Sequence, residues 1–173
     1  MELFDAIRKR RSIRSFQPKA VEKEKLEQIL ESANQAPSAG DTQGYEIVVV
    51  EEGFHLDQIW KTLSDQTFTK PATLALVFCA NEKRSAASYG TRGKDLYSLQ
   101  DATISASYAQ LSATALGLST VWIGAFKEGE VRKAIEAPDH IRPVVILPLG
   151  YSAEEPGRTS RRALSDIVHR DTF

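Results

Sequence analysis

Small residues recur along residues 95–118, and this run constrains the fold more than any other stretch of the chain. Its length and composition predict one long helix, with Gly117 as the cap of its C-terminal end. Alanine and serine occupy most faces of this helix, so neighbouring elements must pack closely on more than one side. The helix is therefore either the centre of the core or a surface shared with a partner subunit. The small residues are Ala102, Ser105, Ala106, Ala109, Ala113 and Ala115.

Helix and strand patterns alternate around this helix. Apolar spacing predicts further helices at 3–11, 21–36, 54–63 and 129–135. Runs of apolar or β-branched residues predict strands at 46–50, 72–80, 119–126 and 141–151. We expect Pro148 to break the last strand, and residues 81–94 to form a polar loop. The pattern is mixed α/β, with more helices than strands and without a repeat or linker.

The composition is that of a globular chain. Its 173 residues are 42% hydrophobic and 26% charged, which excludes a disordered chain and suits a single domain over residues 1–173. The net charge of -1 argues against nucleic-acid binding as the main role. The N-terminus lacks a signal core and no stretch resembles a membrane span, so we expect a cytoplasmic protein without membrane or nucleic-acid partners. Cys79 is the single cysteine, and its apolar neighbours predict a buried, inert thiol.

Familiar catalytic motifs are missing from the sequence. It has no G-x-G-x-x-G after a strand, no G-x-x-x-x-G-K-[ST] and no G-x-S-x-G elbow. The histidines at 55, 140 and 169 stand far apart without metal-ligand spacing, so we expect no metal site. We also expect no catalytic side chain, because no nucleophile with its own base can be assigned. If the protein is an enzyme, a cofactor must carry the chemistry.

Two groups of arginines stand out against the near-neutral charge. The first surrounds Ser12 in the segment RKRRSIR of residues 8–14, and the second lies in the tail, at Arg158, Arg161 and Arg162. If residues 10–14 are extended, Arg10, Ser12 and Arg14 face one side, because residues two apart in a strand share a face.

The cations left over in the first group, Arg8, Lys9 and Arg11, would then face water. Arginine forks beside a hydroxyl suit a phosphate, and the tail arginines would add a second wall. The residues alone leave three interpretations open: a phosphate site, a solvated basic face, or a nucleic-acid patch.

Four segments, in order, resemble the motifs of the nitroreductase family, which are FMN-dependent NAD(P)H oxidoreductases. RRSIRSF resembles the opening motif, and APSAGDTQGYEIVVV resembles the A-P-S-(small)-(small)-N-x-Q-P-W segment with its following strand. SLQDATISASYAQLSATALGLSTVWIGAF resembles the central helix with G-L-G-x-x-W-I-G, and LPLGYSAEEPGRTSRRALSDIVHRD resembles the ending G-Y-P-x-E-x-P-x-x-R-[KR]-P-L. The likeness covers almost the whole chain.

The resemblance implies an α+β fold, with a central mixed or antiparallel sheet flanked by helices, in an intertwined homodimer. It implies FMN as cofactor, NADH or NADPH as reductant, and ping-pong hydride transfer through flavin N5 to a small-molecule acceptor. That acceptor would be a nitroaromatic, a quinone, a flavin or an unknown metabolite. Dehalogenation, flavin fragmentation or azoline oxidation on the same fold stays open, although the expected loop at 81–94 leaves little room for a substrate lid. A non-enzymatic basic-patch binding module is the remaining alternative.

The same resemblance assigns residues to the FMN site. Arg10, Ser12, Arg161 and Arg162 would hold the phosphate, Arg14 would lie nearer the ribityl chain and the N1–C2=O side of the ring, and Arg11 would contribute through its backbone. Pro37, Ser38 and Ala39 would approach the flavin from the other subunit. The backbone of Ile123, Gly124 and Ala125 would pass near flavin N5, and Gln66 would lie near the pyrimidine edge.

The chain departs from the family pattern at three positions. Asp41, Gly44 and Tyr45 stand where asparagine, proline and tryptophan are usual. Asp41 either faces the ring or caps a turn, which is a common role for aspartate. Among the aromatic residues, Trp122 is expected in the core, whereas Tyr89 and Tyr97 are expected to pack at the surface. The departures make the acceptor less predictable than the cofactor.

Overall fold

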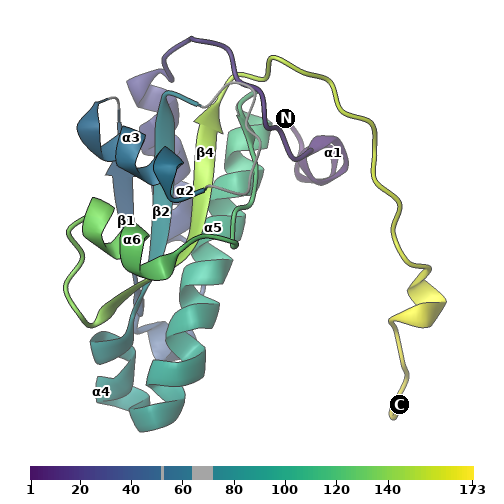
Figure 1. Cartoon of the computed structure of the whole chain (residues 1–173). Helices are drawn as coiled ribbons and strands as arrows, with labels where there is room; N and C mark the ends of the chain where they lie inside the picture. Colours follow the sequence, from purple (N-terminus) through teal and green to yellow (C-terminus); the bar gives the residue numbers. More distant parts are fainter. Residues whose placement is uncertain (52, 64–71) are drawn as a thin grey trace.

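A computed structural model describes residues 1–51, 53–63 and 72–173, and within these ranges it contains one antiparallel sheet of four strands (Figure 1). The strand order is β1-β2-β4-β3. The strands are β1 (Tyr45–Val50), β2 (Leu74–Asn81), β3 (Ser119–Thr120) and β4 (Ile141–Gly150). β2 pairs with β1 on one side, from Tyr45↔Ala80 to Val50↔Ala75, and with β4 on the other. The α+β class is confirmed, and the sheet is the antiparallel form of the two expected.

Successive side chains of β2 point into two separate cores, because neighbouring residues of a strand face opposite sides of the sheet. Leu76 and Phe78 pack towards one pair of helices, whereas Val77 and Cys79 pack towards the other pair. Figure 1 shows the two pairs on opposite sides of the sheet. The first pair is α2 (Lys23–Asn34) with α5 (Ser98–Ala115), and the second is α3 (Phe54–Lys61) with α6 (Glu128–Ala134). Burial on both faces explains the uninterrupted apolar run of β2.

Helix α5 is the central helix that the small residues predict. Its side chains Ala106, Ala109 and Ala113 are buried in the core between the helix, the sheet and α2, and Ala102 is also buried. Two polar side chains on the same helix form hydrogen bonds to neighbouring elements that pack closely against it. Ser105 Oγ donates to the carbonyl of Ala33 at 3.0 Å, and Gln110 Nε2 donates to Thr120 Oγ1 at 3.0 Å. The core interpretation of this helix therefore holds.

The polar loop expected at residues 81–94 is wrong. The chain forms helix α4 (Glu82–Arg92), followed by a short π-helical turn η2 (Gly93–Tyr97) that leads into α5. The Asn81 side chain caps α4 by accepting from the backbone N–H of Arg84 at 3.0 Å. Gly93 has to be glycine, because an added Cβ would lie 2.4 Å from the carbonyl oxygen of Ser85. The polarity that suggested a loop belongs to an exposed helix.

Two expectations about strands also fail. Pro148 does not break β4, since it pairs with Ala75 inside the strand. Strand β3 borders β4 over two residues only, so this part of β4 resembles a sheet edge, where proline is tolerated. The strand expected at 119–126 is confined to β3 and an isolated bridge between Ile123 and Ile146.

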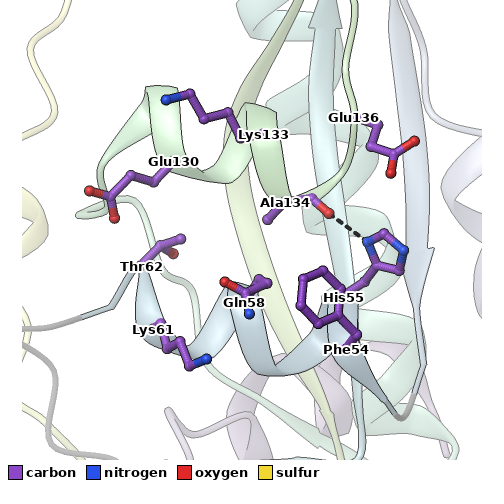
Figure 2. A pocket seen from close by; sticks show the side chains of 9 residues that line it. All are labelled: Phe54, His55, Gln58, Lys61, Thr62, Glu130, Lys133, Ala134 and Glu136. Carbon is purple, nitrogen blue, oxygen red and sulfur yellow. Dashed lines mark hydrogen bonds between the residues drawn. The ribbon is translucent and has the colours of Figure 1, made fainter.

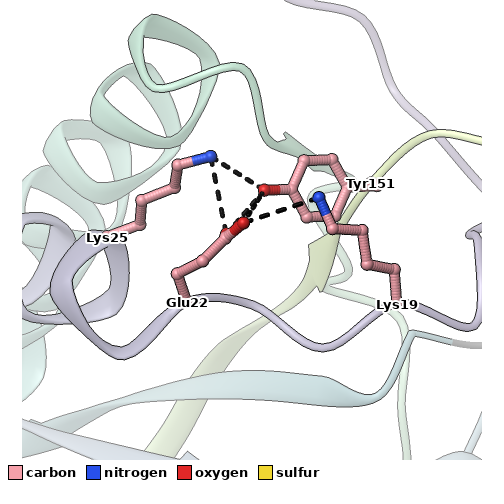
Figure 3. A network of polar contacts seen from close by, with 4 residues as sticks. All are labelled: Lys19, Glu22, Lys25 and Tyr151. Carbon is pink, nitrogen blue, oxygen red and sulfur yellow. Dashed lines mark hydrogen bonds and ion pairs between the residues drawn. The ribbon is translucent and has the colours of Figure 1, made fainter.

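The two ends of the chain cross beside the sheet. The N–H of Ala153 donates to Ser15 at 2.8 Å, and the N–H of Gln17 donates to Tyr151 at 2.9 Å. A side-chain cluster of Lys19, Glu22, Lys25 and Tyr151 reinforces this crossing (Figure 3). In it the Tyr151 hydroxyl donates to the Glu22 carboxylate, Lys25 Nζ donates to that hydroxyl at 2.8 Å, and Lys19 Nζ lies 3.8 Å above the ring centre.

Beyond the crossing the two ends differ, because the N-terminal helix packs against α5 and buries Ala6, whereas the C-terminal segment extends away from the body of the protein (Figure 1). Helix α1 (Leu3–Lys9) and the segment 155–173 stand to one side of the sheet and its helices (Figure 1). Residues 155–173 are all exposed, although they contain a short helical turn, η3 (Leu164–Asp166). The other short turn, η1 (Ala39–Asp41), precedes β1. In the described part of the chain, none of the helices has the length and apolar character needed to cross a membrane.

Candidate functional site

A cationic pocket of about 390 Å³ lies between the two chain ends. One wall comes from α1 and the segment after it, and the other comes from the segment after β4. The lining residues are Ile7, Arg8, Arg10, Arg11, Ser12, Arg14, Pro156, Gly157, Arg158, Thr159 and Arg161. Six arginines and two hydroxyls therefore meet here, without an aspartate or glutamate among the lining side chains. The arrangement is built for an anion, since guanidinium forks and hydroxyls are its natural donors.

The guanidinium groups stand close enough to repel one another. Burial lowers the pKa of Arg10, and the charges of Arg161 and Arg11 lower it further. Arg161 Nη1 donates within its own segment, to Thr159 Oγ1 at 2.7 Å. Among the described residues, the ion pairs of the pocket lining are limited to Arg8, which contacts Asp5 at 2.6 Å. Like charges held together without counter-charges are unfavourable, and a bound anion would relieve them.

Backbone contacts fix the N-terminal wall. The N–H of Ile13 donates to Thr120 of β3 at 3.0 Å, and Ser12 forms a parallel bridge with the same residue. The side chains of Ile13 and Phe16 are buried in a small hydrophobic cluster and anchor the segment to the body of the protein. Alternating buried and exposed residues leave Arg14 pointing outward to the pocket.

The structure brings together the serine and most of the arginines that were predicted to contact FMN. Arg10, Arg11, Ser12, Arg14 and Arg161 all line the pocket, although about 150 residues separate the two groups in the sequence. Arg162 does not line it, and its guanidinium donates instead to the carbonyl of Asp166. Arg8 and Arg11, which were expected to face water, line the pocket with the others.

Pro37, Ser38 and Ala39 lie away from this pocket, at the start of the loop that leads to β1. A buried carboxylate holds the loop, since Asp101 of α5 accepts from the N–H of Ala39 at 3.0 Å and from the N–H of Gly44 at 3.2 Å. Asp101 is only 2% exposed. The loop is thus rigidly tied to the central helix, and Asp41 lies in its turn with a positive φ of 55°.

The segment expected near the reactive edge of a flavin is partly buried. Ile123 is fully buried, and both of its backbone groups bond to Ile146, so neither is free for a ligand. Gly124 and Ala125 are exposed. Trp122 is 37% exposed, so its expected place in the core is wrong, and its Nε1 lies beside Gly124. Gln66 lies outside the described residues.

The aromatic residues of α4 and η2 lie at the surface, as expected. Tyr89 is 40% exposed and packs edge-to-face on Tyr97, with ring centres 5.2 Å apart. Arg92 Nε donates to the Tyr97 hydroxyl at 2.9 Å. This cluster touches the 37–44 loop, because a Cβ at Gly40 would lie 2.0 Å from the Tyr89 hydroxyl.

A second pocket, of about 350 Å³, lies between α3 and α6 (Figure 2). Its charged side chains are of both signs, with Lys61 and Lys133 against Glu130 and Glu136, and His55 Nδ1 contacts the carbonyl of Ala134 at 2.9 Å. None of the residues predicted to bind a ligand lines it. Across the described ranges, no group of three or more His, Cys, Asp or Glu side chains is arranged to hold a metal. The cationic pocket is therefore the candidate site.

Comparison with known proteins agrees with the motifs. The model of the nitroreductase family matches residues 7–92 and 60–151. The chain belongs to the nitroreductase family.

Relatives in this nitroreductase family cover nearly the whole chain. A protein of Methanothermobacter thermautotrophicus, whose name gives NADH dehydrogenase and NAD(P)H nitroreductase as candidate activities, is 32% identical over 162 residues, covering 91% of this chain and 81% of the relative. An FMN reductase [NAD(P)H] of Bacillus subtilis is 28% identical over 185 residues, covering 99% and 74%. The crystal structure of a nitroreductase family protein from Clostridium difficile 630 superposes with a TM-score of 0.85 at 31% identity, covering all of both chains.

Reasoning from sequence missed residues in the candidate site and in the neighbouring 37–44 loop. Arg8 lines the pocket although it was expected to face water, because a position at a helix end does not show where the side chain points. Arg158, which the sequence placed with the other tail arginines in a possible second wall, also lines the pocket. Asp101 did carry a signal, because it is a lone carboxylate on a helix whose other inward residues are small and mostly apolar. A charge at such a position needs buried partners, and here they are backbone N–H groups.

Proposed function

We propose that this chain is an FMN-dependent oxidoreductase that takes reducing equivalents from NADH or NADPH and delivers them to a small-molecule acceptor. One observation carries the proposal: Arg10, Ser12 and Arg161, from opposite ends of the chain, line one cationic pocket. Family membership supports the class of reaction, and the name of the Bacillus subtilis relative supports the cofactor. A cytoplasmic location and a single domain over residues 1–173 remain predictions.

The pocket residues fit a phosphate monoester. A phosphate dianion has three acceptor oxygens, and arginine forks with hydroxyls supply donors from several directions. Arg10 and Ser12 would hold the group from the N-terminal wall, and Arg161 from the tail. Arg158 and Thr159 line the same wall as Arg161 and are further candidate donors. Removing Arg10 from water already lowers its pKa, so an anion would restore the favourable environment of its charge.

FMN, when bound, would supply the hydride chemistry, and the residues of the chain would supply binding, orientation and electrostatics. Arg14 would keep positive charge beside the ribityl chain and the N1–C2=O side of the ring. Gly124 is exposed, and a Cβ there would meet only Trp122 Nε1, at 3.9 Å, so the backbone at this position is open to a ligand. No side-chain acid or base is assigned, and NAD(P)H and the acceptor would use the same site in turn, in a ping-pong order.

A homodimer would complete the site. Apolar side chains on α1 are exposed in the single chain, with Phe4 at 68% and Leu3 at 59%, and Leu164, Ile167 and Val168 are exposed on the tail. Burial of such side chains is worth roughly 1.5–3 kcal/mol each, which favours a partner surface. The 37–39 loop does not line the cationic pocket of its own chain, so a partner's loop would have to supply that contact. Sedimentation equilibrium should give twice the chain mass.

The absorbance spectrum of the protein with added FMN tests the proposal. We expect a bound-flavin band that bleaches anaerobically with NADH, NADPH or both. The double variant Arg10→Ala/Arg161→Ala should lose on the order of a hundredfold or more in FMN affinity, because it removes two charged hydrogen-bond donors. The double variant Lys9→Ala/Arg170→Ala is the matched control, since it removes the same charge from exposed positions outside the pocket.

A basic-patch module for nucleic acid would behave differently. It would gain no flavin band with FMN, and its binding of an oligonucleotide would weaken steeply with salt. Equal loss of FMN affinity in the two double variants would indicate a diffuse effect of charge and would contradict the assigned pocket.

A further inference from the structure

Glu154 lies at the point where the two chain ends cross. One of its carboxylate oxygens, Oε1, accepts from the backbone N–H of Arg14 and from that of Ser15, the latter at 3.1 Å. The adjacent Ala153 N–H donates back to the carbonyl of Ser15 at 2.8 Å. One side chain thus connects two segments that are 140 residues apart.

The local turn holds the Glu154 side chain in place. The Ser152 hydroxyl donates to the carbonyl of Glu154, and the N–H of Glu154 donates to the Ser152 oxygen at 3.1 Å. A short loop closed by its own hydroxyl fixes the backbone from which the carboxylate projects. The carboxylate therefore reaches the N-terminal segment from a rigid base.

The pocket residues follow directly on either side of this contact. Ser12 and Arg14 line the pocket from the N-terminal segment, and Pro156 and Gly157 line it from the segment after Glu154. Glu154 itself does not line the pocket. Its position suits a role in setting the distance between the two walls.

We propose that Glu154 is a positioning residue for the phosphate site: by accepting two backbone N–H groups of the N-terminal wall, it holds that wall in register with the tail arginines. The identity of the ligand rests on the proposed function, whereas the role of Glu154 rests on the contacts described here. Positioning and electrostatics predict opposite changes in FMN affinity when Glu154 is removed. A carboxylate close to a phosphate repels it, so electrostatics alone predicts that removing Glu154 tightens binding. Positioning predicts that removing it weakens binding.

The experiment compares FMN with riboflavin, which lacks the phosphate, by fluorescence titration of the flavin-free protein. We expect Glu154→Ala to weaken FMN by about tenfold or more, since it removes two hydrogen bonds to a charged acceptor, while riboflavin affinity stays within about twofold. Glu154→Gln keeps an oxygen that can accept both N–H groups, so it should bind FMN as the wild type does or slightly more tightly. Glu155→Ala, at the exposed neighbouring position, removes the same charge without these contacts and should behave like Glu154→Gln.

Glu154→Asp is a conservative second variant that keeps the test valid if Glu154→Ala fails to fold. It keeps the charge but shortens the reach, so it should lose FMN affinity while Glu154→Gln retains it. The proposal is overturned if Glu154→Asp binds FMN normally, if Glu154→Ala tightens FMN binding, or if FMN and riboflavin weaken equally. Failure of the function proposed above would look different, because the wild type itself would then bind neither flavin, or both with equal affinity.

Discussion

Replacing Gly44 by proline, the residue usual in the family pattern, should destabilise this protein. The N–H of Gly44 donates to Oδ2 of Asp101 at 3.2 Å, and Asp101 is 2% exposed. Proline has no N–H, so the buried carboxylate would lose this donor, at a cost of about 1.5–3 kcal/mol for a hydrogen bond to a charged group. A Cβ at this position would also lie 2.9 Å from the same oxygen and 3.1 Å from Ser85 Cβ. Overpacking of this kind adds about 1–3 kcal/mol.

Urea unfolding of the flavin-free protein, at one fixed protein concentration, measures these costs separately. Gly44→Ala keeps the N–H and reports the crowding alone, whereas Gly44→Pro adds the lost hydrogen bond and should cost about 3 kcal/mol or more in total. Gly129→Ala is the control, because a Cβ there meets nothing within 4 Å and the residue lies in helix α6. That change should be neutral or stabilising by about 0.5–1 kcal/mol.

A double-mutant cycle shows whether Asp101 is the cause. With glycine at position 44, Asp101→Asn places the amide N–H₂ of asparagine against the backbone N–H of Gly44, and two donors repel each other. Proline has no N–H, so Asp101→Asn should destabilise the Gly44→Pro variant less than it destabilises the wild type. A Gly44→Pro variant as stable as the wild type would refute the reasoning. If the two losses of unfolding free energy simply add in the double variant, Gly44 and Asp101 do not interact and the hydrogen bond is not the cause.

Two further predictions concern other parts of the molecule. Burial raises the pKa of the Cys79 thiol to about 12, so the native protein should resist thiol reagents at pH 8 and react once unfolded; rapid labelling of the folded chain would contradict this. The hydrogen bond from Tyr151 lowers the pKa of Glu22 from 4.5 to about 2. The stabilisation that this ionised carboxylate gives is therefore present above about pH 4.5 and is lost as the pH falls to about 2. The difference in urea midpoint between wild type and Tyr151→Phe should accordingly shrink between pH 7 and pH 2, and a constant difference would show that the pair does not contribute through its charge.

The elements with strong periodic signals could be predicted from the sequence. The apolar run of β2 and the small residues of α5 each have one stable solution, because a strand buried on both faces and a closely packed helix leave few alternatives. Helix α4 could not be found in the same way, since its residues are polar and its start depends on the side chain of Asn81. Pro148 was misjudged because the short partner strand β3, which makes β4 edge-like, has no distinct pattern.

The cationic character of the candidate site could be predicted from the sequence, but the full set of residues that line it could not. Clustered arginines around Ser12 suggest an anion site, although the residues alone also allow a solvated basic face or a nucleic-acid patch. Whether Arg158 or Arg162 joins them depends on the path of an exposed tail, and a sequence pattern does not encode that path. Glu154 was missed because a glutamate in a polar tail looks like a solvated charge, and only the crossing of the two ends reveals its contacts.

The crossing also sets when the pocket can form. A ribosome releases residues 8–14 almost at once, but the tail that faces them emerges last, after every strand of the sheet. Domains begin to fold during synthesis, and their N-terminal parts are available first. The N-terminal arginines therefore spend nearly the whole of translation without the wall that faces them. A chain that stops short of its last twenty or so residues would have its sheet but would lack the C-terminal wall of the cationic pocket.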